Sequence, residues 1–167
     1  APTIEEYAGA CTSALKEYLP KNGISTKGLI LEMEPGRSLH GDTAIHLTTV
    51  KNAKPMNLPL KWDKYIMDTT QFWFTGGIYE HHLHDYVIAN RADEEKTEKA
   101  DIVGRSCYGD RLLPFVRVPK NLRIGDIFAL LDVGAYQEVS MSNFNAMPRP
   151  ATYLVKGSTV HLIRKPE

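Results

Sequence analysis

The spacing of apolar side chains changes along the chain from one helical stretch to a series of short strands. Over residues 4–18 the apolar positions recur every three or four residues, which predicts an amphipathic helix. Thr3 and Glu6 form a Thr-x-x-Glu capping box at its start, in which each side chain can bond to the other residue's backbone N–H. Pro20 and Gly23 are expected to end the helix.

The strand expected next runs directly into a loop that carries an acid and an arginine. Residues 28–33 (GLILEM) form an apolar run of strand length, and the sequence EPGR (34–37) follows at once. A helix, a strand and such a loop form an α/β arrangement, in which ligands bind beyond the carboxyl end of the strand. The guanidinium of Arg37 suits a phosphate or a carboxylate. A surface turn with an ion pair is the alternative.

From Ala44 onward the helical period disappears, and short apolar runs alternate with turn-rich segments. Residues 92–99 (ADEEKTEK) are expected to form a charged, solvated connection with at most one helical turn. Because no helices separate the apolar runs, the sequence predicts a mainly β fold, an antiparallel β-barrel or sandwich. The runs that predict strands are 44–50, 65–69, 83–90, 101–107, 127–133, 152–155 and 159–163.

Polar side chains gather after the run at 127–133. Gly134 and Ala135 allow a close approach of the backbone, and a phenol, hydroxyls and amides follow: Tyr136, Ser140, Ser142, Asn143 and Asn145. Small residues with convergent polar groups beside a buried strand are typical of a loop that faces a ligand. A polar turn between two strands is an equal alternative.

Composition narrows the possible functions and the setting. The chain has 167 residues, which fits one domain or one domain with a piece of another. Twenty basic and twenty acidic residues cancel, so bulk charge favours neither nucleic acid nor an anionic membrane. No apolar run approaches the roughly 20 residues of a membrane span, and no signal segment opens the sequence. Because Ala1 is followed almost directly by a helix, we expect a fragment or a processed product.

The cysteines and histidines predict no metal site. Cys11 lies on the apolar stripe of the first helix, so we expect a buried, inert core thiol. Cys107 is far from it in sequence, and the pair indicates neither a disulfide framework nor a zinc site, which makes a reducing, cytoplasmic setting the default. No carboxylate or cysteine stands at a spacing that would complete a site with His81, His82 and His84.

Several motifs stand in one order along the chain. They are EPGR (34–37), VGRSCYGD (103–110), GDIFALLDVGAY (125–136), SNFN (142–145) and RP (149–150). From about Lys27 to Val155 this order resembles the C-terminal part of the pyridoxal-phosphate-dependent decarboxylases of the diaminopimelate, ornithine and arginine group. EPGR alone is a weak signal, but the ordered set is specific.

The resemblance implies an architecture. These enzymes have an N-terminal (β/α)8 barrel that holds the cofactor and a C-terminal β domain. Residues 1–40 would then be the last helix, the last strand and the EPGR loop of the barrel, and residues 41–167 the β domain. This division agrees with the change from α/β to β patterning just after Arg37.

The resemblance also implies functions for single residues. Glu34 matches the acid that faces the pyridine nitrogen of pyridoxal phosphate, where a carboxylate keeps that nitrogen protonated. Gly36, Arg37 and Tyr136 match contacts of the cofactor, with Arg37 at its phosphate or at the substrate carboxylate. Cys107 matches the cysteine that protonates the α-carbon after carbon dioxide is lost, in the site of the partner subunit of a head-to-tail homodimer.

The substrate side departs from the pattern of the diaminopimelate enzymes. The implied substrate contacts are Arg37, Tyr79, Tyr108 and Asp110. Those enzymes carry Cys-Glu where this chain has Cys107-Tyr108, in a turn that is one residue shorter, and Asp-Gly-Gly where it has Asp68-Thr69-Thr70. We therefore expect an amino-acid-like substrate other than diaminopimelate, whose far end lacks a free ammonium, is masked or is tethered to a carrier.

The lysine that binds the cofactor covalently lies upstream in this family, and neither it nor the glycine-rich phosphate loop has a match here. Two other functions stand beside a decarboxylase: a non-catalytic regulatory or dimerisation relative, and an amino-acid racemase of the same fold. The joint presence of Glu34, Arg37, Cys107 and Tyr136 disfavours the first, because a regulator needs no proton donor. The cysteine turn and the order of GAY and SNFN disfavour the second.

Overall fold

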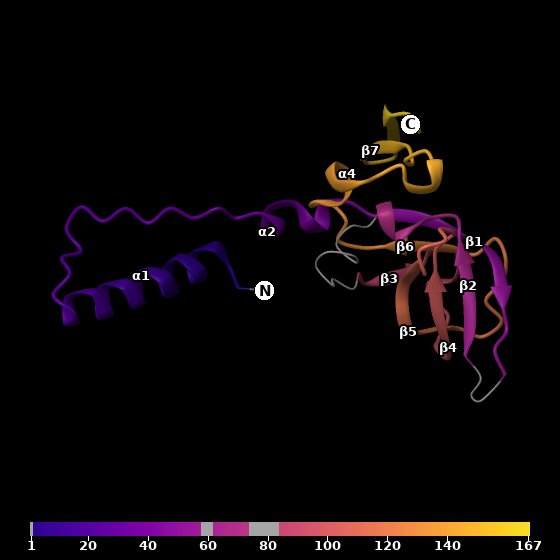
Figure 1. Cartoon of the computed structure of the whole chain (residues 1–167), viewed down its shortest axis with the longest axis horizontal. Helices are drawn as coiled ribbons and strands as arrows, with labels where there is room; N and C mark the ends of the chain where they lie inside the picture. The colour runs from indigo at the N-terminus through magenta and orange to yellow at the C-terminus, as the bar shows by residue number, and fades with distance from the viewer. Residues whose placement is uncertain (1, 58–61, 74–83) are drawn as a thin grey trace. The chain divides into compact units, whose positions relative to one another are not determined.

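The computed structural model describes residues 2–57, 62–73 and 84–167. The chain divides into two compact units, Ala1–Pro35 and Gly36–Glu167 (Figure 1). The division falls inside the EPGR loop, whereas the sequence places the end of the barrel segment at residue 40. The assignment of the two segments to a barrel and a β domain stays a prediction. None of the described helices has both the length and the apolar character to cross a membrane.

The first unit contains one long helix, α1 (Ile4–Lys21), and its start is as predicted. The Glu6 backbone N–H donates to Thr3 Oγ1 over 3.2 Å, and the Thr3 N–H donates to the Glu6 carboxylate over 2.7 Å. The helix ends at Lys21, between the predicted Pro20 and Gly23, with Pro20 inside its last turn. The Asn22 side chain donates to the Tyr18 carbonyl over 2.8 Å, which satisfies a carbonyl that the helix itself leaves open.

The apolar stripe of α1 is exposed in this chain. None of the described residues of α1 is buried, and Cys11 is exposed, so the expectation of a core thiol is wrong here. The predicted strand at 28–33 is also absent, since these residues have no regular structure beyond a turn. The reason is the same in both cases. An apolar stripe needs a packing partner and a strand needs a neighbour to pair with, and the described part of this unit offers neither.

The second unit is built on a six-stranded sheet (Figure 1). The chain enters it through α2 (Arg37–His40) and the 3-10 turn η1 (Gly41–Thr43). The strands follow in the spatial order β3-β6-β1-β2-β4-β5. Their bounds are β1 (His46–Lys54), β2 (Asp63–Met67), β3 (Tyr86–Ile88), β4 (Lys96–Val103), β5 (Arg111–Pro119) and β6 (Ile127–Leu130). The 3-10 turn η2 (Gln71–Trp73) follows β2, and η3 (Ala89–Arg91) follows β3.

The sheet curls so that its two edge strands lie near each other. The Tyr86 hydroxyl of β3 donates to the Arg117 carbonyl of β5, and the Lys96 ammonium donates to the Tyr86 carbonyl over 3.0 Å. The first bond links the two ends of the strand order and the second links β3 to β4, which agrees with the predicted barrel or sandwich. The pairing is mixed, however, because β2 and β4 run parallel while the other pairs are antiparallel. The expectation of a purely antiparallel sheet is therefore wrong at one pair.

The predicted strands correspond to observed ones, but one strand was missed and several bounds differ. β5 was not predicted, because Pro114 and the left-handed Phe115 (φ 57°) interrupt its alternation. Residues 96–99 belong to β4 and not to a solvated connection, while residues 104–107 turn away from it. Residues 131–133 lie beyond the end of β6. Leu83, the first residue of another predicted strand, lies outside the described residues.

The core lies between the curled faces of this sheet. Its fully buried side chains include Phe128, Met67, Ile88, Ile102, Leu130 and Val50. Burial of each of these removes apolar surface from water and contributes about 1.5–3 kcal/mol. At the start of β6 the buried Asp126 carboxylate accepts bonds from Arg91 over 3.1 Å and from Asn90 over 2.9 Å. The sheet therefore closes around a core whose buried carboxylate is paired.

The last segment follows β6 and ends in a separate two-stranded hairpin. It contains α4 (Gln137–Ser140), the 3-10 turn η4 (Phe144–Ala146) and a hairpin of β7 (Thr152–Lys156) and β8 (Thr159–Arg164). Arg164 of β8 donates to Glu138 over 3.0 Å and to the Pro150 carbonyl over 3.1 Å. The Asn143 side chain donates to the Glu167 carbonyl over 2.9 Å. These bonds fasten the hairpin to α4 and to the SNFN loop.

Candidate active site

Three loops of the second unit gather around Cys107. They are the turn 104–110 after β4, the 3-10 turn η2 and the 3-10 turn η4, and we call them the Cys107 cluster. Phe72 of η2 stacks on Phe144 of η4 with ring centroids 4.2 Å apart, and Tyr108 meets both rings at an edge. The Ser142 N–H donates to the Phe72 carbonyl over 3.1 Å. Segments far apart in sequence are thus packed into one polar and aromatic surface.

Asp110 lies under the turn and holds its backbone. It is 4% exposed, and its carboxylate accepts from the Gln71 N–H over 2.6 Å and from the Ser106 N–H over 2.9 Å. A Cβ at Gly104 would collide with this carboxylate, so the close approach requires glycine. Both oxygens of Asp110 are engaged with backbone donors. This geometry favours a structural function for Asp110 over the substrate contact that the sequence predicts.

Cys107 itself is exposed at the tip of the turn, beside Asn145 of η4. The Cys107 N–H lies 3.4 Å from Asn145 Oδ1, and Sγ lies 3.5 Å from both Oδ1 and Nδ2 of the same amide. Asn145 has a left-handed backbone (φ 60°, ψ 25°), which asparagine tolerates better than most residues. The neighbouring Tyr108 is 61% exposed, so the surface around the thiol is open to solvent.

A second group of predicted residues meets near α2. The Arg37 guanidinium lies over the Tyr136 ring, 5.1 Å from its centroid, and a Cβ at Gly36 would collide with the Tyr136 hydroxyl. Tyr136 has a left-handed backbone (φ 67°). Gly134 packs against the carbonyl of Gly41, to which its N–H donates over 2.8 Å. The structure thus brings together Gly36, Arg37 and Tyr136.

This second group fits an anionic ligand such as the phosphate of pyridoxal phosphate. Arg37 supplies a delocalised cation, and Tyr136 supplies a hydroxyl that makes no hydrogen bond with the described residues. The absence of a side chain at Gly36 lets the Tyr136 hydroxyl approach the Gly36 backbone closely, which places this hydroxyl beside Arg37. The three residues therefore suit the contact that the resemblance implies for them.

Of the remaining predicted residues, one belongs to the first unit, three lie outside the described residues and one is buried. Glu34 belongs to the first unit, where it is exposed. Tyr79, His81 and His82 lie outside the described residues. His84 is buried, with Nδ1 2.8 Å from the Leu131 carbonyl and Nε2 3.3 Å from the Gln137 amide. Within residues 2–57, 62–73 and 84–167, no group of three His, Cys, Asp or Glu residues is arranged to hold a metal ion.

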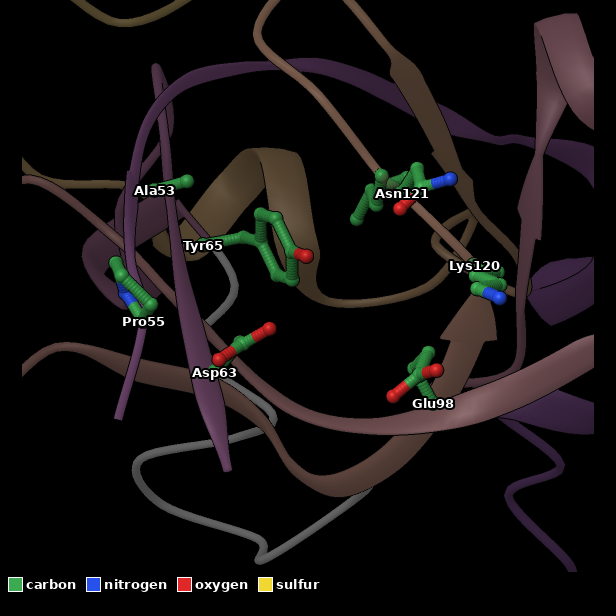
Figure 2. Close-up of a pocket in the computed structure, with 8 residues that line it drawn as sticks. Ala53, Pro55, Asp63, Tyr65, Glu98, Lys120 and Asn121 are labelled. Atoms are coloured by element: carbon green, nitrogen blue, oxygen red, sulfur yellow. The ribbon is translucent and has the colours of Figure 1, made fainter. Parts of the chain in front are cut away.

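A hollow of about 290 Å³ on the sheet shares no residue with the Cys107 cluster. Figure 2 shows Asp63, Tyr65, Glu98, Lys120 and Asn121 among the residues that line it. Burial raises the pKa of Tyr65, and the carboxylates of Asp63 and Glu98 add to that effect. A neutral phenol between two carboxylates provides no nucleophile and no anion site. We therefore take the Cys107 cluster as the candidate active site.

Two functional details of this site escaped sequence analysis. Asn145 was noted only as one amide in a polar loop, and its contact with Cys107 joins positions 38 residues apart. Phe72 gave no signal, because nothing in its neighbourhood distinguishes it from a core aromatic. The SNFN motif in order with the cysteine turn was the one feature that could have suggested the contact.

Comparison with known proteins gives a consistent result. No protein-family model matches the chain. A protein from Archaeoglobus fulgidus named diaminopimelate decarboxylase is 32% identical over 170 residues, covering 100% of this chain and 38% of that protein. One of the same name from Methanothermobacter thermautotrophicus is 30% identical over 164 residues, covering 98% of this chain and 37% of that protein. The crystal structure of diaminopimelate decarboxylase from M. jannaschii matches with a TM-score of 0.77 and 29% identity, covering 99% of this chain and 36% of that one.

Over nearly its whole length the chain is similar to decarboxylases of the diaminopimelate group, which supports a fragment of such an enzyme. The resemblance inferred from EPGR, the cysteine turn, GAY and SNFN is thereby confirmed, as is the mainly β fold. The chain spans somewhat over a third of the length of the curated relatives that it matches. The regulatory and racemase alternatives are not favoured by these matches.

Proposed function

We propose that the chain is the C-terminal part of a pyridoxal-phosphate-dependent amino-acid decarboxylase, a carboxy-lyase, in which Cys107 donates a proton to the substrate. The observation that carries this proposal is the exposed Cys107 thiol on a turn that Asp110 braces, in a chain similar over nearly its whole length to diaminopimelate decarboxylases. Cys11 is exposed as well, so the motif order and the braced turn distinguish Cys107, and exposure alone does not.

Arg37 and Tyr136 would hold the phosphate of the cofactor, since they combine a cation and a hydroxyl, and Gly36 allows that hydroxyl to lie close to the backbone. Glu34 would face the pyridine nitrogen, as the family resemblance implies. When bound, pyridoxal phosphate supplies an electron sink for the charge that carbon dioxide leaves behind. The protein residues then have to orient the substrate and deliver a proton.

Cys107 would perform that delivery. Its Sγ–H bond breaks, the proton moves to the α-carbon that lost carbon dioxide, and a thiolate remains. Because Cys107 is exposed, water can return a proton to this thiolate after each turnover. General acids of this kind typically accelerate reactions by about 10² to 10⁴-fold. The resemblance further suggests a head-to-tail homodimer in which the thiol serves the active site of the partner subunit. Each complete subunit would also contain the N-terminal barrel.

The substrate would be an amino acid, and Arg37, Tyr79 and Tyr108 would contact it. Relatives are named diaminopimelate decarboxylase, and one solved structure from M. jannaschii is described as a co-complex with L-lysine. The Cys107-Tyr108 sequence instead favours a substrate without a free ammonium at its far end. Turnover of diaminopimelate and of amino acids masked at the far end by the complete enzyme would decide between them.

The test of the proton donor is Cys107→Ala in the complete enzyme. Release of carbon dioxide should continue, while formation of the correct amine should fall by about 10² to 10⁴-fold. Cys11→Ala is the matched control, since it also removes a thiol and should leave product formation unchanged. An unaltered yield of amine per carbon dioxide in Cys107→Ala would refute the assignment.

The placement of the thiol across a dimer needs a second experiment. Subunits with Cys107→Ala are mixed with subunits that lack the barrel lysine. If the thiol serves the partner's site, mixed dimers regain roughly one working site. No recovery on mixing, with dimers formed, would restrict Cys107 to its own subunit.

A further inference from the structure

The polar group that lies against the Cys107 thiol comes from Asn145, 38 residues further along the chain. Its Oδ1 lies 3.4 Å from the Cys107 backbone nitrogen, and its Nδ2 lies 3.5 Å from Sγ. We propose that Asn145 is a positioning residue, which orients the Cys107 thiol and stabilises the thiolate that proton donation leaves. This inference rests on the proposed function of Cys107 and adds a specific partner to it.

A side-chain amide suits a proton donor because it can serve both of its states. The carbonyl oxygen accepts from a thiol S–H, and the NH2 group donates to a thiolate. The backbone N–H of Cys107 can bond only to an acceptor, so it faces the carbonyl oxygen of the Asn145 amide. The NH2 group of this amide lies 3.5 Å from Sγ, where it can donate to the thiolate.

The surroundings hold this amide in place. The Phe144 ring stacks on Phe72 at 4.2 Å, which fastens η4 to η2 immediately before Asn145. On the other side Asp110 holds η2 and the cysteine turn together through the Gln71 and Ser106 backbone N–H groups. Both partners of the contact are therefore carried by loops that are braced against each other. A contact between two merely exposed side chains would have no such support.

The left-handed backbone of Asn145 determines which substitutions test the idea. Asn145→Asp keeps the size and tolerates this backbone, but it replaces the NH2 donor by a carboxylate oxygen. A carboxylate beside sulfur disfavours the thiolate by charge repulsion, at about 1 kcal/mol for this distance in a fully hydrated setting. Asn145→Gly removes the amide altogether and permits the same backbone. Asn145→Ala would add strain and is less informative.

The readout is alkylation of the 167-residue chain by iodoacetamide, followed at each cysteine by peptide mass across a range of pH. Cys11 is the internal reference thiol, since it is exposed on α1 and lies outside the Cys107 cluster. In Asn145→Asp the rate at Cys107 relative to Cys11 should fall about five- to tenfold at neutral pH, with the pH profile displaced upward. Asn145→Gly should lie between wild type and Asn145→Asp.

An unchanged ratio of the two rates in both variants, with wild-type circular dichroism, would overturn the proposal. If Asn145→Asp alone does not fold, the Asn145→Gly ratio decides by itself. Because this readout needs neither cofactor nor turnover, it is separate from the proposed function. A decarboxylase test that fails at Cys107 while the alkylation ratio still responds would leave the thiol–amide coupling intact and remove only its use in catalysis.

Discussion

The two units of the chain use apolar side chains in opposite ways. In Ala1–Pro35 the stripe of α1 is well formed and no described residue of the helix is buried. In Gly36–Glu167 the apolar residues of the sheet are inside, and Phe128, Ile102 and Val50 are completely buried. Local signals such as the capping box favour a helix from the sequence itself, although most helical stability in proteins comes from tertiary packing. Burial of an apolar face requires a second surface to pack against. The curled sheet provides this surface itself, because its faces pack against each other.

The same contrast holds for polar groups. In the second unit buried carboxylates have partners: Asp126 is bonded to Arg91 and Asn90, and Asp110 to two backbone N–H groups. The described ion pair of α1 joins Glu17 and Lys21 on its exposed surface, at 2.8 Å. An exposed pair of this kind contributes about 0.3–0.5 kcal/mol, whereas removing one partner of a buried carboxylate is much more costly. We therefore expect the second unit to govern cooperative unfolding.

The largest expected effect comes from the core of the sheet. Phe128→Ala should lower the free energy of unfolding by about 3–5 kcal/mol, because it removes a fully buried ring and leaves a cavity. Tyr7→Ala is the matched aromatic truncation on α1, where the side chain is 58% exposed, and it should change the value by less than about 0.5 kcal/mol. Urea denaturation followed by far-UV circular dichroism measures both. Equal effects would mean that α1 is packed in solution.

The second prediction concerns the pH dependence of the second unit. Burial lowers the pKa of His46 to about 4, against a smaller opposing effect of Asp68, and its Nε2 lies 2.9 Å from Thr69 Oγ1. Between pH 6.5 and about 4 the unfolded chain binds a proton that the folded chain does not. Stability should therefore fall as the pH falls through this window, by about 3 kcal/mol at its lower end.

His46→Gln is the control, since glutamine can still bond to Thr69 but does not titrate. The decline between pH 6.5 and about 4 should disappear in this variant. The carboxyl groups contribute at lower pH. Burial raises the pKa of the Asp126 carboxyl, but hydrogen bonds from Arg123, Asn90 and Arg91 outweigh burial and hold this pKa below its ordinary value of 3.8. The stability that Asp126 contributes is therefore lost only as the pH falls further. A His46→Gln profile identical to wild type above pH 4 would contradict the assignment.

Much of the β unit could be predicted because its signals are local. The runs at 44–50 and 127–133 are apolar and bounded by turn residues, and they became β1 and β6. The parallel pairing of β2 with β4 could not be predicted, since a period of two does not reveal strand direction. β5 was missed because Pro114 breaks its pattern, although the strand accommodates it at a bulge beside Phe115.

The candidate site was predictable in its residues but not in their contacts. The motif order identified Cys107 together with Gly36, Arg37 and Tyr136, and the structure brings the last three together. It did not reveal that Asp110 is buried beneath the turn or that Asn145 lies against the thiol. Both facts depend on loops from distant parts of the sequence meeting over the sheet. The strand expected at 28–33 is absent because a strand needs a neighbouring strand to pair with, and the described part of the first unit contains none.

The smallest expected effect sharpens the contrast from the side of α1. Thr3→Ala removes the hydroxyl that caps the Glu6 N–H and should weaken the helix by about 1 kcal/mol. Thr12→Ala is the matched control inside the same helix, where the hydroxyl bonds back to the Ala8 carbonyl over 2.7 Å. Because alanine has the higher helix propensity, it should strengthen the helix by a few tenths of a kcal/mol.

Amide hydrogen exchange resolved by residue measures both. Exchange in the first turns of α1 should accelerate several-fold in Thr3→Ala and slow in Thr12→Ala, while the amides of β1 and β6 keep their rates. If Thr3→Ala also accelerated exchange in the sheet, the two units would unfold together, and α1 would owe its order to the second unit and not to its own cap.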